Sequence, residues 1–407
     1  MPKRSASRDS TSTASSRTDS PEDLSPSARP RRKRRRRRRT RRVALVALFA
    51  LLAIPGWSLG RVLAANTTDP LGVRVVEWAR DHHMGGMVSA IEQSWYAHHQ
   101  PPTGGTPRGG IPRAPVTVAH RSRLVRTVKP PFVPPNIPPL VSGPLPSEGV
   151  WQPSGRLVNG RPVVWFTYLR PDAVHTSLLA GVAYFNMSHL TATLHAGTDV
   201  PGGGPWIDGA QIATTDYPRV IAAFNSAFRL DNSGGGYYAE GRTVQPLVAG
   251  RASFVSYANG HVDVGLWGRD DAMTPGVNAV RQNLGLIVDG GSLVPGLADA
   301  DSAQWGGTVG NQIYVWRSGV GVDARGNLIY AAGPGLNVAT LAEIMRRAGC
   351  VRAMELDINS WWVTLAEYTP DGHGGVQASN LLPSMIRSPS RYLSNSTRDF
   401  IEIDIRR

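Results

Sequence analysis

The spacing of apolar residues divides the chain into stretches of different character. From Val43 to Gly60, eighteen consecutive residues carry no charge, a length that just reaches across the hydrocarbon core of a bilayer. Between Leu71 and Gln100, apolar residues return at roughly helical intervals with a break near Gly85 and Gly86, which predicts a short amphipathic helix or a helix pair. After Val150, short β-branched or aromatic runs alternate with glycine turns, and this pattern predicts β-hairpins.

Four segments carry the hairpin pattern, and one carries a helix pattern. The expected hairpins are GVAYFNMSHLTATLHAG (181–197), ASFVSYANGHVDVGLWG (252–268), LGLIVDGGSLVPG (284–296) and SGVGVDARGNLIYAAG (318–333). NVATLAEIMRRAGC (337–350) has apolar residues on one face, Asn337 at the N-cap and Gly349 just past the end, so it predicts a helix. Strand pairs with a few packed helices, without regular βαβ alternation, indicate an α+β fold of hairpin-rich mixed sheets.

Basic residues gather just before the first apolar stretch. Residues 1–28 are rich in Ser, Thr, Pro and charge, so we expect them to be disordered. Arg29–Arg42 is almost wholly basic. Because positive residues stay on the cytoplasmic side, the sequence predicts one transmembrane helix over 43–63 with a cytoplasmic N-terminus. Two alternatives stay open: a signal peptide cleaved after Ala64, and an arginine arm that binds nucleic acid.

The net charge of +14 belongs mostly to this N-terminal tail. Residues 1–42 hold 16 of the 44 Lys and Arg and 4 of the 30 Asp and Glu, which leaves 28 basic and 26 acidic residues in the other 365. A nearly neutral body gives no support for a nucleic-acid surface outside the tail. The one cysteine, Cys350, lies in an apolar run and is expected to be a small buried hydrophobe rather than a nucleophile.

The chain is therefore expected to have five parts. They are a disordered basic cytoplasmic tail (1–42), a transmembrane helix or uncleaved signal anchor (43–63), a membrane-proximal helical segment (64–100), a Pro-rich linker (101–149) and an extracytoplasmic domain (150–407). Runs such as KPPFVPPNIPPLVSGPLP make the linker an extended, semi-rigid spacer.

Two histidine pairs raise the question of a metal site. His82 and His83, and likewise His98 and His99, have no cysteine or carboxylate at ligand spacing around them. Solvated surface histidines are the simpler interpretation, and neither a metal nor a cofactor is expected.

Polar chemistry is concentrated where the run CVRAMELDINSWW (350–362) ends. Glu355 and Asp357 are two residues apart, so on a strand they point the same way. Two close carboxylates compete for ionisation, and one of them can keep a proton for general acid–base catalysis. The alternative is that both are hydrogen-bonded turn formers. Trp361 and Trp362 either stack on sugar rings or pack in the core.

Arginine and glycine residues suggest how an anion would be held. Arg317 lies in an otherwise apolar strand, so its guanidinium should meet a carboxylate or an anionic ligand. Asn225 and then Arg229 follow a second apolar strand, 220–224. The glycine run 234–236 is either a flexible loop or a place where backbone amides approach a phosphate.

In this order the motifs resemble the phosphodiester glycosidase family over about residues 181–362. NSAFR (225–229) is similar to the family's Asn-Gly-Gly-Phe-Phe, and RSGVGVDARGNL (317–328) to its arginine motif. AMELDINS (353–360) is similar to its Leu-Asp-Gly-Gly-Gly-Ser strand end. The resemblance implies that Asn225, Arg317 and Asp357 line the site. The family glycines are replaced after Asn225 and again after Asp357, so the pocket is expected to differ in shape.

These observations lead to a set of candidate site residues. The expected catalytic residues are Asp357, Glu355 and Arg317, and the expected substrate-binding residues are Asn225, Arg229, Asn359, Ser360 and Trp361. The resemblance implies a hydrolase of a glycosidic bond to a phosphodiester or related envelope glycan, with a carbohydrate or sugar-phosphate substrate. The basic run and the apolar stretch at the N-terminus predict that it is membrane-anchored and faces outward. A non-catalytic module that binds glycan with the same cleft is the alternative, and a scaffold whose tail binds an acidic cytoplasmic partner is a third hypothesis.

Overall fold

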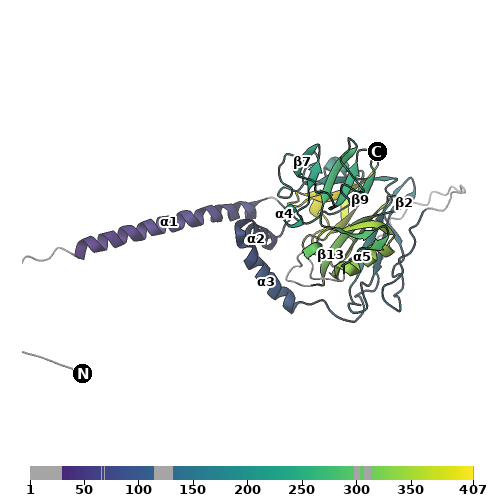
Figure 1. Cartoon of the computed structure of the whole chain (residues 1–407), viewed down its shortest axis with the longest axis horizontal. Helices are drawn as coiled ribbons and strands as arrows, with labels where there is room; N and C mark the ends of the chain where they lie inside the picture. The colour runs from purple at the N-terminus through teal and green to yellow at the C-terminus, as the bar shows by residue number, and fades with distance from the viewer. Residues whose placement is uncertain are drawn as a thin grey trace, which may run out of the picture. The chain divides into compact units, whose positions relative to one another are not determined.

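The computed structural model describes residues 30–65, 67, 69–113, 132–297, 303–306 and 313–406 (Figure 1). The chain divides into two compact units, residues 1–61 and 62–407. The long helix α1 (Pro30–Ala64) makes up the described part of the first unit and ends just inside the second. No helix within the described ranges combines the length and apolar character needed to cross a membrane, so the transmembrane helix predicted at 43–63 is not supported.

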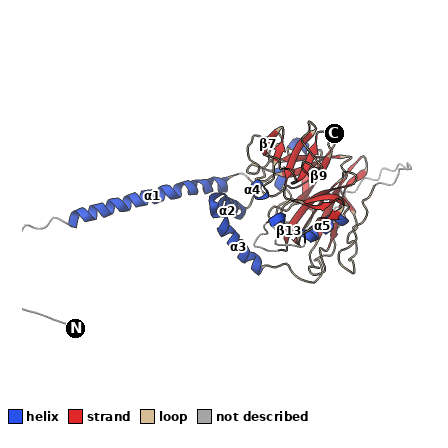
Figure 2. Ribbon diagram, viewed as in Figure 1, coloured by secondary structure: helices blue, strands red, loops and turns tan. Residues whose placement is uncertain are grey.

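A large antiparallel sheet forms one layer of the second unit (Figure 2). Its eight strands, in order across the sheet, are β1 (Gln152–Val158), β2 (Arg161–Leu169), β3 (Ala180–Phe185), β14 (Leu328–Leu336), β13 (Val315–Asp323), β15 (Cys350–Glu355), β11 (Leu286–Asp289) and β12 (Ser292–Leu293).

Two smaller antiparallel sheets have five strands each. One consists of β7 (Arg242–Gln245), β6 (Tyr237–Ala239), β10 (Val277–Gln282), β8 (Ala252–Tyr257) and β9 (Val262–Leu266). The other consists of β17 (Val376–Asn380), β16 (Leu365–Pro370), β5 (Val220–Asn225), β18 (Phe400–Ile405) and β4 (Leu190–His195).

The helices of the second unit are few and mostly short, as an α+β fold predicts. They are α2 (Leu71–Ala79), the kinked turn η1 (Arg80–Met84), α3 (Gly85–His98), α4 (Leu230–Ser233), α5 (Val338–Arg347) and the single turns Thr214–Asp216, Ala303–Trp305 and Arg391–Leu393. The expected helix pair is confirmed as α2 and α3. The break falls at His82 and His83, which have non-helical backbone angles and are separated from Gly85 by one residue.

The sequence pattern predicted helix α5 correctly. The Asn337 side chain accepts a hydrogen bond from the Thr340 amide at 2.7 Å, which caps the first turn. Gly349 follows the last turn with φ of +98°, a backbone angle that glycine adopts without strain. The apolar face of the helix is fully buried against the large sheet, and β15 therefore begins at a fixed place.

Three of the four expected hairpins are confirmed: β8–β9, β11–β12 and β13–β14. The fourth prediction was wrong, because β3 pairs with β2 and β14 whereas β4 pairs with β18 in a different sheet. β3 is a fully buried apolar strand, whereas apolar and polar residues alternate at the start of β4. Such patterns indicate which side chains are buried without identifying the partner strand. The short turn between them carries the chain from one sheet to the other.

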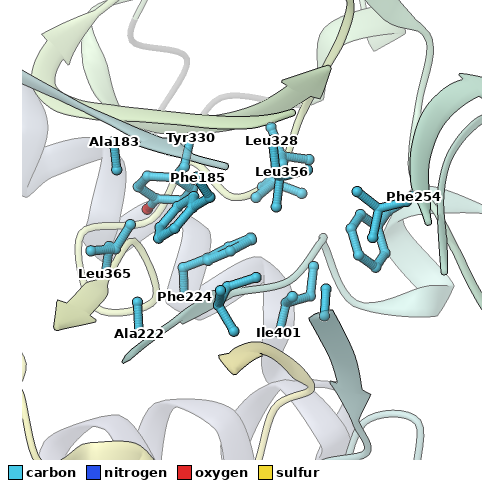
Figure 3. Close-up of a cluster of buried hydrophobic side chains, with 14 of the residues drawn as sticks. Ala183, Phe185, Ala222, Phe224, Phe254, Leu328, Tyr330, Leu356, Leu365 and Ile401 are labelled. Atoms are coloured by element: carbon cyan, nitrogen blue, oxygen red, sulfur yellow. The ribbon is translucent and has the colours of Figure 1, made fainter. Parts of the chain in front are cut away.

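The main core fills the space between these two sheets. Figure 3 shows Phe185 and Tyr330 from the large sheet pointing toward Phe224 on β5. The ring centroids lie 6.3 Å apart for Phe185 and Phe224 and 5.0 Å apart for Phe224 and Tyr330. All three side chains are fully buried. This packing holds the last residue of β5, Asn225, against the large sheet.

The described part of the Pro-rich stretch lies against the domain. Ile137 is buried, and its amide donates to the Gly149 carbonyl at 2.9 Å. The Trp151 indole donates to the Pro135 carbonyl at 2.8 Å, and Arg347 of α5 donates to the carbonyls of Pro138 and Pro139. Residues 132–149 thus form part of the domain surface rather than a spacer that stands apart from it.

Candidate functional site

The ends of β5 and β15, which lie in different sheets, are joined through Ser318 of β13. The Ser318 hydroxyl accepts from the Asn225 amide group at 3.0 Å and from the Asp357 backbone amide at 3.1 Å, and it donates to the Asp357 carbonyl at 3.1 Å. The Ser318 amide donates to that carbonyl as well, at 2.9 Å. A single buried hydroxyl therefore sets the positions of two predicted site residues, although no sequence pattern distinguished Ser318 from its neighbours.

Asn225 is fully engaged inside the protein. Its Oδ1 accepts from the Tyr330 hydroxyl at 2.9 Å and from the Thr364 amide at 3.1 Å. Its Nδ2 donates to the Ser226 carbonyl as well as to Ser318. A buried amide with four such bonds has used its hydrogen-bonding capacity. The structure gives Asn225 a positioning part, and direct contact with substrate stays a prediction.

Asp357 lies in the wall of a cavity of about 340 Å³. Its side chain is 4% exposed, and its Oδ1 accepts from the Asn359 amide at 2.9 Å. Its Oδ2 accepts from Nη2 of Arg398 at 3.3 Å. Burial raises the pKa of Asp357 to about 6, and the Arg398 charge opposes part of that rise. At neutral pH this carboxyl can therefore take up and release a proton.

Two further predicted residues, Asn359 and Arg229, line the same cavity. Phe228, Trp362 and Arg398 join them. Arg398 lies over the buried Trp362 ring, 4.9 Å from its centroid. Its Nε is buried and has no hydrogen-bond partner among the described residues. The cavity therefore combines a carboxyl with a guanidinium that has donor capacity to spare.

Arg229 in the cavity wall is surrounded by carboxylates from α2, η1 and α4. Glu77 lines it, and the Glu77 carboxylate meets Nη1 of Arg229 at 2.7 Å. Asp81 meets Nη2 of the same arginine at 2.7 Å, and Asp231 meets its Nε at 3.4 Å. The charge of Arg229 is thus neutralised by carboxylates of the chain itself, and the one on α2, Glu77, also lines the cavity. Sequence analysis had placed this helix outside the domain and missed the contact.

Arg317 and Glu355 form a separate buried pair. Nη1 of Arg317 lies 2.5 Å from Oε1 of Glu355, which confirms that the guanidinium meets a carboxylate. Arg317 also donates to the carbonyls of Leu336 and Ile313. Burial raises the pKa of Glu355, and Arg317 opposes that rise. In the described part of the chain neither residue lines the cavity around Asp357, so their direct part in catalysis stays a prediction.

Ser360 and Trp361 lie beside the cavity rather than in it. Both line an apolar groove of about 460 Å³ between helices α2 and α3 and the loop after β15. Trp361 is 37% exposed, whereas Trp362 is 4% exposed. Trp361 therefore has an exposed ring face, whereas Trp362 is packed in the protein interior.

Other motifs have structural explanations. The amides of Gly234, Gly235 and Gly236 donate to the Leu230 carbonyl, the Ser233 hydroxyl and the Gln282 side chain, so the glycine run does not offer its amides to a phosphate. A Cβ on Gly236 would lie 2.4 Å from the Pro246 carbonyl oxygen, which explains a glycine there.

The remaining candidates are the single cysteine and the two histidine pairs. Cys350 is buried, as expected. The four paired histidines are exposed. Across the ranges that the structure describes, there is no group of three or more His, Cys, Asp or Glu suited to a metal ion.

Sequence reasoning missed a second arginine of the same kind as Arg317. Arg281 lies within β10, and its Nε meets Asp399 at 2.6 Å with both side chains fully buried. Its Nη2 donates to the Phe228 carbonyl and so holds one wall of the cavity. The signal was available, because Arg281 interrupts an apolar strand as Arg317 does. Asn283, two residues later, donates to the Glu355 and Leu356 carbonyls and holds the other wall.

Comparison with known proteins agrees with the motifs. The fold is similar to the catalytic domain of zebrafish N-acetylglucosamine-1-phosphodiester alpha-N-acetylglucosaminidase, which is auto-inhibited by its pro-peptide in that structure. The two sequences are 16% identical, the match covers 63% of this chain and 88% of that chain, and the TM-score is 0.39. It is also similar to a Synechocystis protein, with 13% identity, coverage of 62% and 64%, and a TM-score of 0.36. A search of curated proteins found no match. The resemblance expected from the motifs is confirmed over residues 218–357, which match the phosphodiester glycosidase family.

Proposed function

We propose that this protein hydrolyses the glycosidic bond between a sugar and a phosphodiester. The observation that carries the proposal is the buried Asp357 carboxyl, whose pKa is raised to about 6, in a cavity wall beside the Arg398 guanidinium. The family match over residues 218–357 supports the reaction class.

The site suits a reaction in which the leaving group is a phosphate. A phosphate monoester departs as an anion, so it needs a positive charge more than a proton. That charge comes from Arg229 and from Arg398, whose Nε has no hydrogen-bond partner in the described part of the chain. Asp357 takes a proton from the attacking water as the bond from water to the anomeric carbon forms and the bond to phosphate oxygen breaks. Glu355 and Arg317 hold the strand end from which Asp357 emerges.

A substrate must compete with the protein's own carboxylates. Glu77 and Asp81 already occupy two sides of the Arg229 guanidinium. A phosphate that reaches Arg229 therefore replaces Glu77 there. Assays need protein that retains helix α2, because removal of this helix changes the charge of the cavity.

The test uses the full chain and a panel of α- and β-linked sugar phosphodiesters and envelope glycan fragments. Wild-type protein is expected to release free sugar from one of them, and Asp357→Asn to lower that rate by about 10²- to 10⁴-fold. Arg269→Gln is a control that also changes one charge, because Arg269 is 47% exposed and neither it nor its partners Asp270 and Asp289 line the cavity. Sugar release that is unchanged in the Asn variant would remove Asp357 from the reaction.

A non-catalytic glycan-binding function is the second candidate. The partly exposed Trp361 ring beside the cavity and the replaced family glycines favour it. Binding of a fragment from the same panel, without any sugar release, would make this the better account.

The location of the domain is also a proposal, which rests on the basic run before the apolar stretch at Val43. The domain is placed outside the cytoplasm. Cys350 is buried, so a cysteine introduced at the exposed Ser188 is the reactive one. A membrane-impermeant maleimide applied to intact cells should label Ser188→Cys and leave Ser5→Cys unlabelled. If Ser188→Cys is not labelled, the domain lies inside the cell and the proposal is wrong.

A further inference from the structure

We infer that the substrate carries a long hydrocarbon chain on the far side of its phosphate, and that the apolar groove beside the cavity binds this chain. The inference rests on the proposed function and names the class of the aglycone, an acyl or prenyl chain. The groove, of about 460 Å³, lies between helices α2 and α3 and the loop after β15.

Apolar side chains from three parts of the chain make up the groove. They are Val73 and Val76 of α2, Ile91 and Trp95 of α3, and Trp361 and Ile386 of the domain. Ile91 is 63% exposed, Trp95 59% and Ile386 50%. Clustered large apolar side chains in contact with water mark a binding surface rather than a random feature of the exterior.

The groove adjoins the cavity around Asp357. Glu77, Asn359 and Trp362 line both. A ligand whose anionic group lies near Arg229 and Arg398 can therefore extend into the groove without leaving the protein surface. Hydrocarbon next to a phosphate matches an apolar groove next to two arginines.

The polar groups of the groove do not suit a second sugar. Glu92 forms an ion pair with Arg80, with 2.5 Å between Oε1 of Glu92 and Nη2 of Arg80. Oδ1 of Asn359 accepts from the Trp361 amide at 2.9 Å, and Glu77 pairs with Arg229. The Tyr96 and Ser360 side chains are hydrogen-bonded to each other. A sugar ring needs several convergent donors and acceptors, and a hydrocarbon chain needs none. The chemistry of the lining therefore favours the chain.

The experiment compares esters that share one sugar-1-phosphate and differ only in the alkyl group: methyl, hexyl and decyl, each below its micelle concentration. Burial of a methylene gains up to about fourfold in affinity, so kcat/KM should rise by about tenfold or more from methyl to decyl. Ile91→Ser and Trp95→Ala should each reduce the decyl-to-methyl ratio. Ile207→Ser, also an exposed isoleucine but outside the groove, should leave the ratio unchanged.

The outcomes separate this inference from the proposed function. Equal kcat/KM for methyl and decyl esters would overturn the hydrocarbon chain while the hydrolase stands. A chain-length preference that survives Ile91→Ser and Trp95→Ala would place the chain elsewhere and overturn the groove. If no ester is hydrolysed, the proposed hydrolase function is wrong, and binding measurements test the groove instead. Decyl phosphate should then bind more tightly than methyl phosphate to wild type but not to Ile91→Ser. Equal binding of the two phosphates to wild type would overturn the groove as the site of the hydrocarbon chain.

Discussion

The Arg398 guanidinium donates to the Asp357 carboxylate at 3.3 Å and also lies over the Trp362 ring, 4.9 Å from its centroid. Trp362 lies within reach of two more arginines, Arg387 and Arg391, at 5.6 and 5.3 Å. The aromatic face fixes Arg398 in place, so its charge acts on Asp357 from a defined direction. Charge and carboxyl are therefore arranged before any substrate arrives.

Activity should depend on pH through Asp357. A base must be ionised, so kcat/KM is expected to rise about tenfold per pH unit below pH 6 and to level off above it. Arg398→Gln removes a charge that favours the ionised form, and the midpoint should move to higher pH. The check is the pH–rate profile of both proteins. A midpoint that stays in place in the variant would show that Arg398 does not act on the titrating group.

Stability should depend on pH through the same group, with a defined sign. The folded-state pKa of Asp357 lies above its ordinary value of 3.8. Its protonated form therefore contributes stability that is complete below the ordinary value and is lost as pH rises through about 6. Between pH 4 and 7, the unfolding free energy of wild type should fall relative to Asp357→Asn by roughly 3 kcal/mol at most. Denaturant unfolding at several pH values measures this, and a constant difference would contradict it.

Glu77→Gln should improve binding of an anionic substrate. The substitution keeps the size of the side chain but removes the charge that neutralises Arg229 in the cavity. KM should fall by a few-fold, since one charged contact is worth about 1 kcal/mol at a partly exposed site. Asp231→Asn is the matched control, because its carboxylate is 68% exposed and lies 3.4 Å from the same arginine. A higher KM in Glu77→Gln would mean that Glu77 itself binds substrate.

Removing one partner of the buried Arg317–Glu355 pair should lower the free energy of unfolding more than replacing both partners. Arg317→Met leaves the Glu355 carboxylate buried and unpaired, so it should lower the unfolding free energy by about 3–5 kcal/mol. Adding Glu355→Gln should recover part of that loss. Denaturant unfolding of the wild type, both single variants and the double variant gives the coupling energy. A loss in the double variant equal to the sum of the two single losses would show that the pair is not coupled.

The sequence predicted what local patterns determine. Asn337 and Gly349 bracket α5, and the alternation of 318–333 with its turn at Asp323 predicts the β13–β14 hairpin. A guanidinium in an apolar strand predicted the partner of Arg317. Each of these depends on residues close in the chain, or on the cost of burying a charge alone.

The remaining features depend on contacts between distant segments. The strands β3 and β4 are adjacent in the chain but belong to different sheets, and burial alone does not identify a partner. Glu77 and Arg229 are 152 residues apart, and only the fold brings α2 to the cavity. Glu355 and Asp357 each meet a separate arginine, and Asp357 lines the cavity whereas Glu355 does not. Their joint part in catalysis stays a prediction.

The most direct test of the central claim is to let the protein hydrolyse, in ¹⁸O-labelled water, a sugar phosphodiester that it has been found to cleave. The ³¹P NMR isotope shift then shows whether the phosphate product contains ¹⁸O. A glycosidase breaks the bond between the anomeric carbon and oxygen, so the phosphate monoester should contain no ¹⁸O. Incorporation of ¹⁸O into the phosphate would show attack at phosphorus, and the glycosidase mechanism with Asp357 as base would then be contradicted.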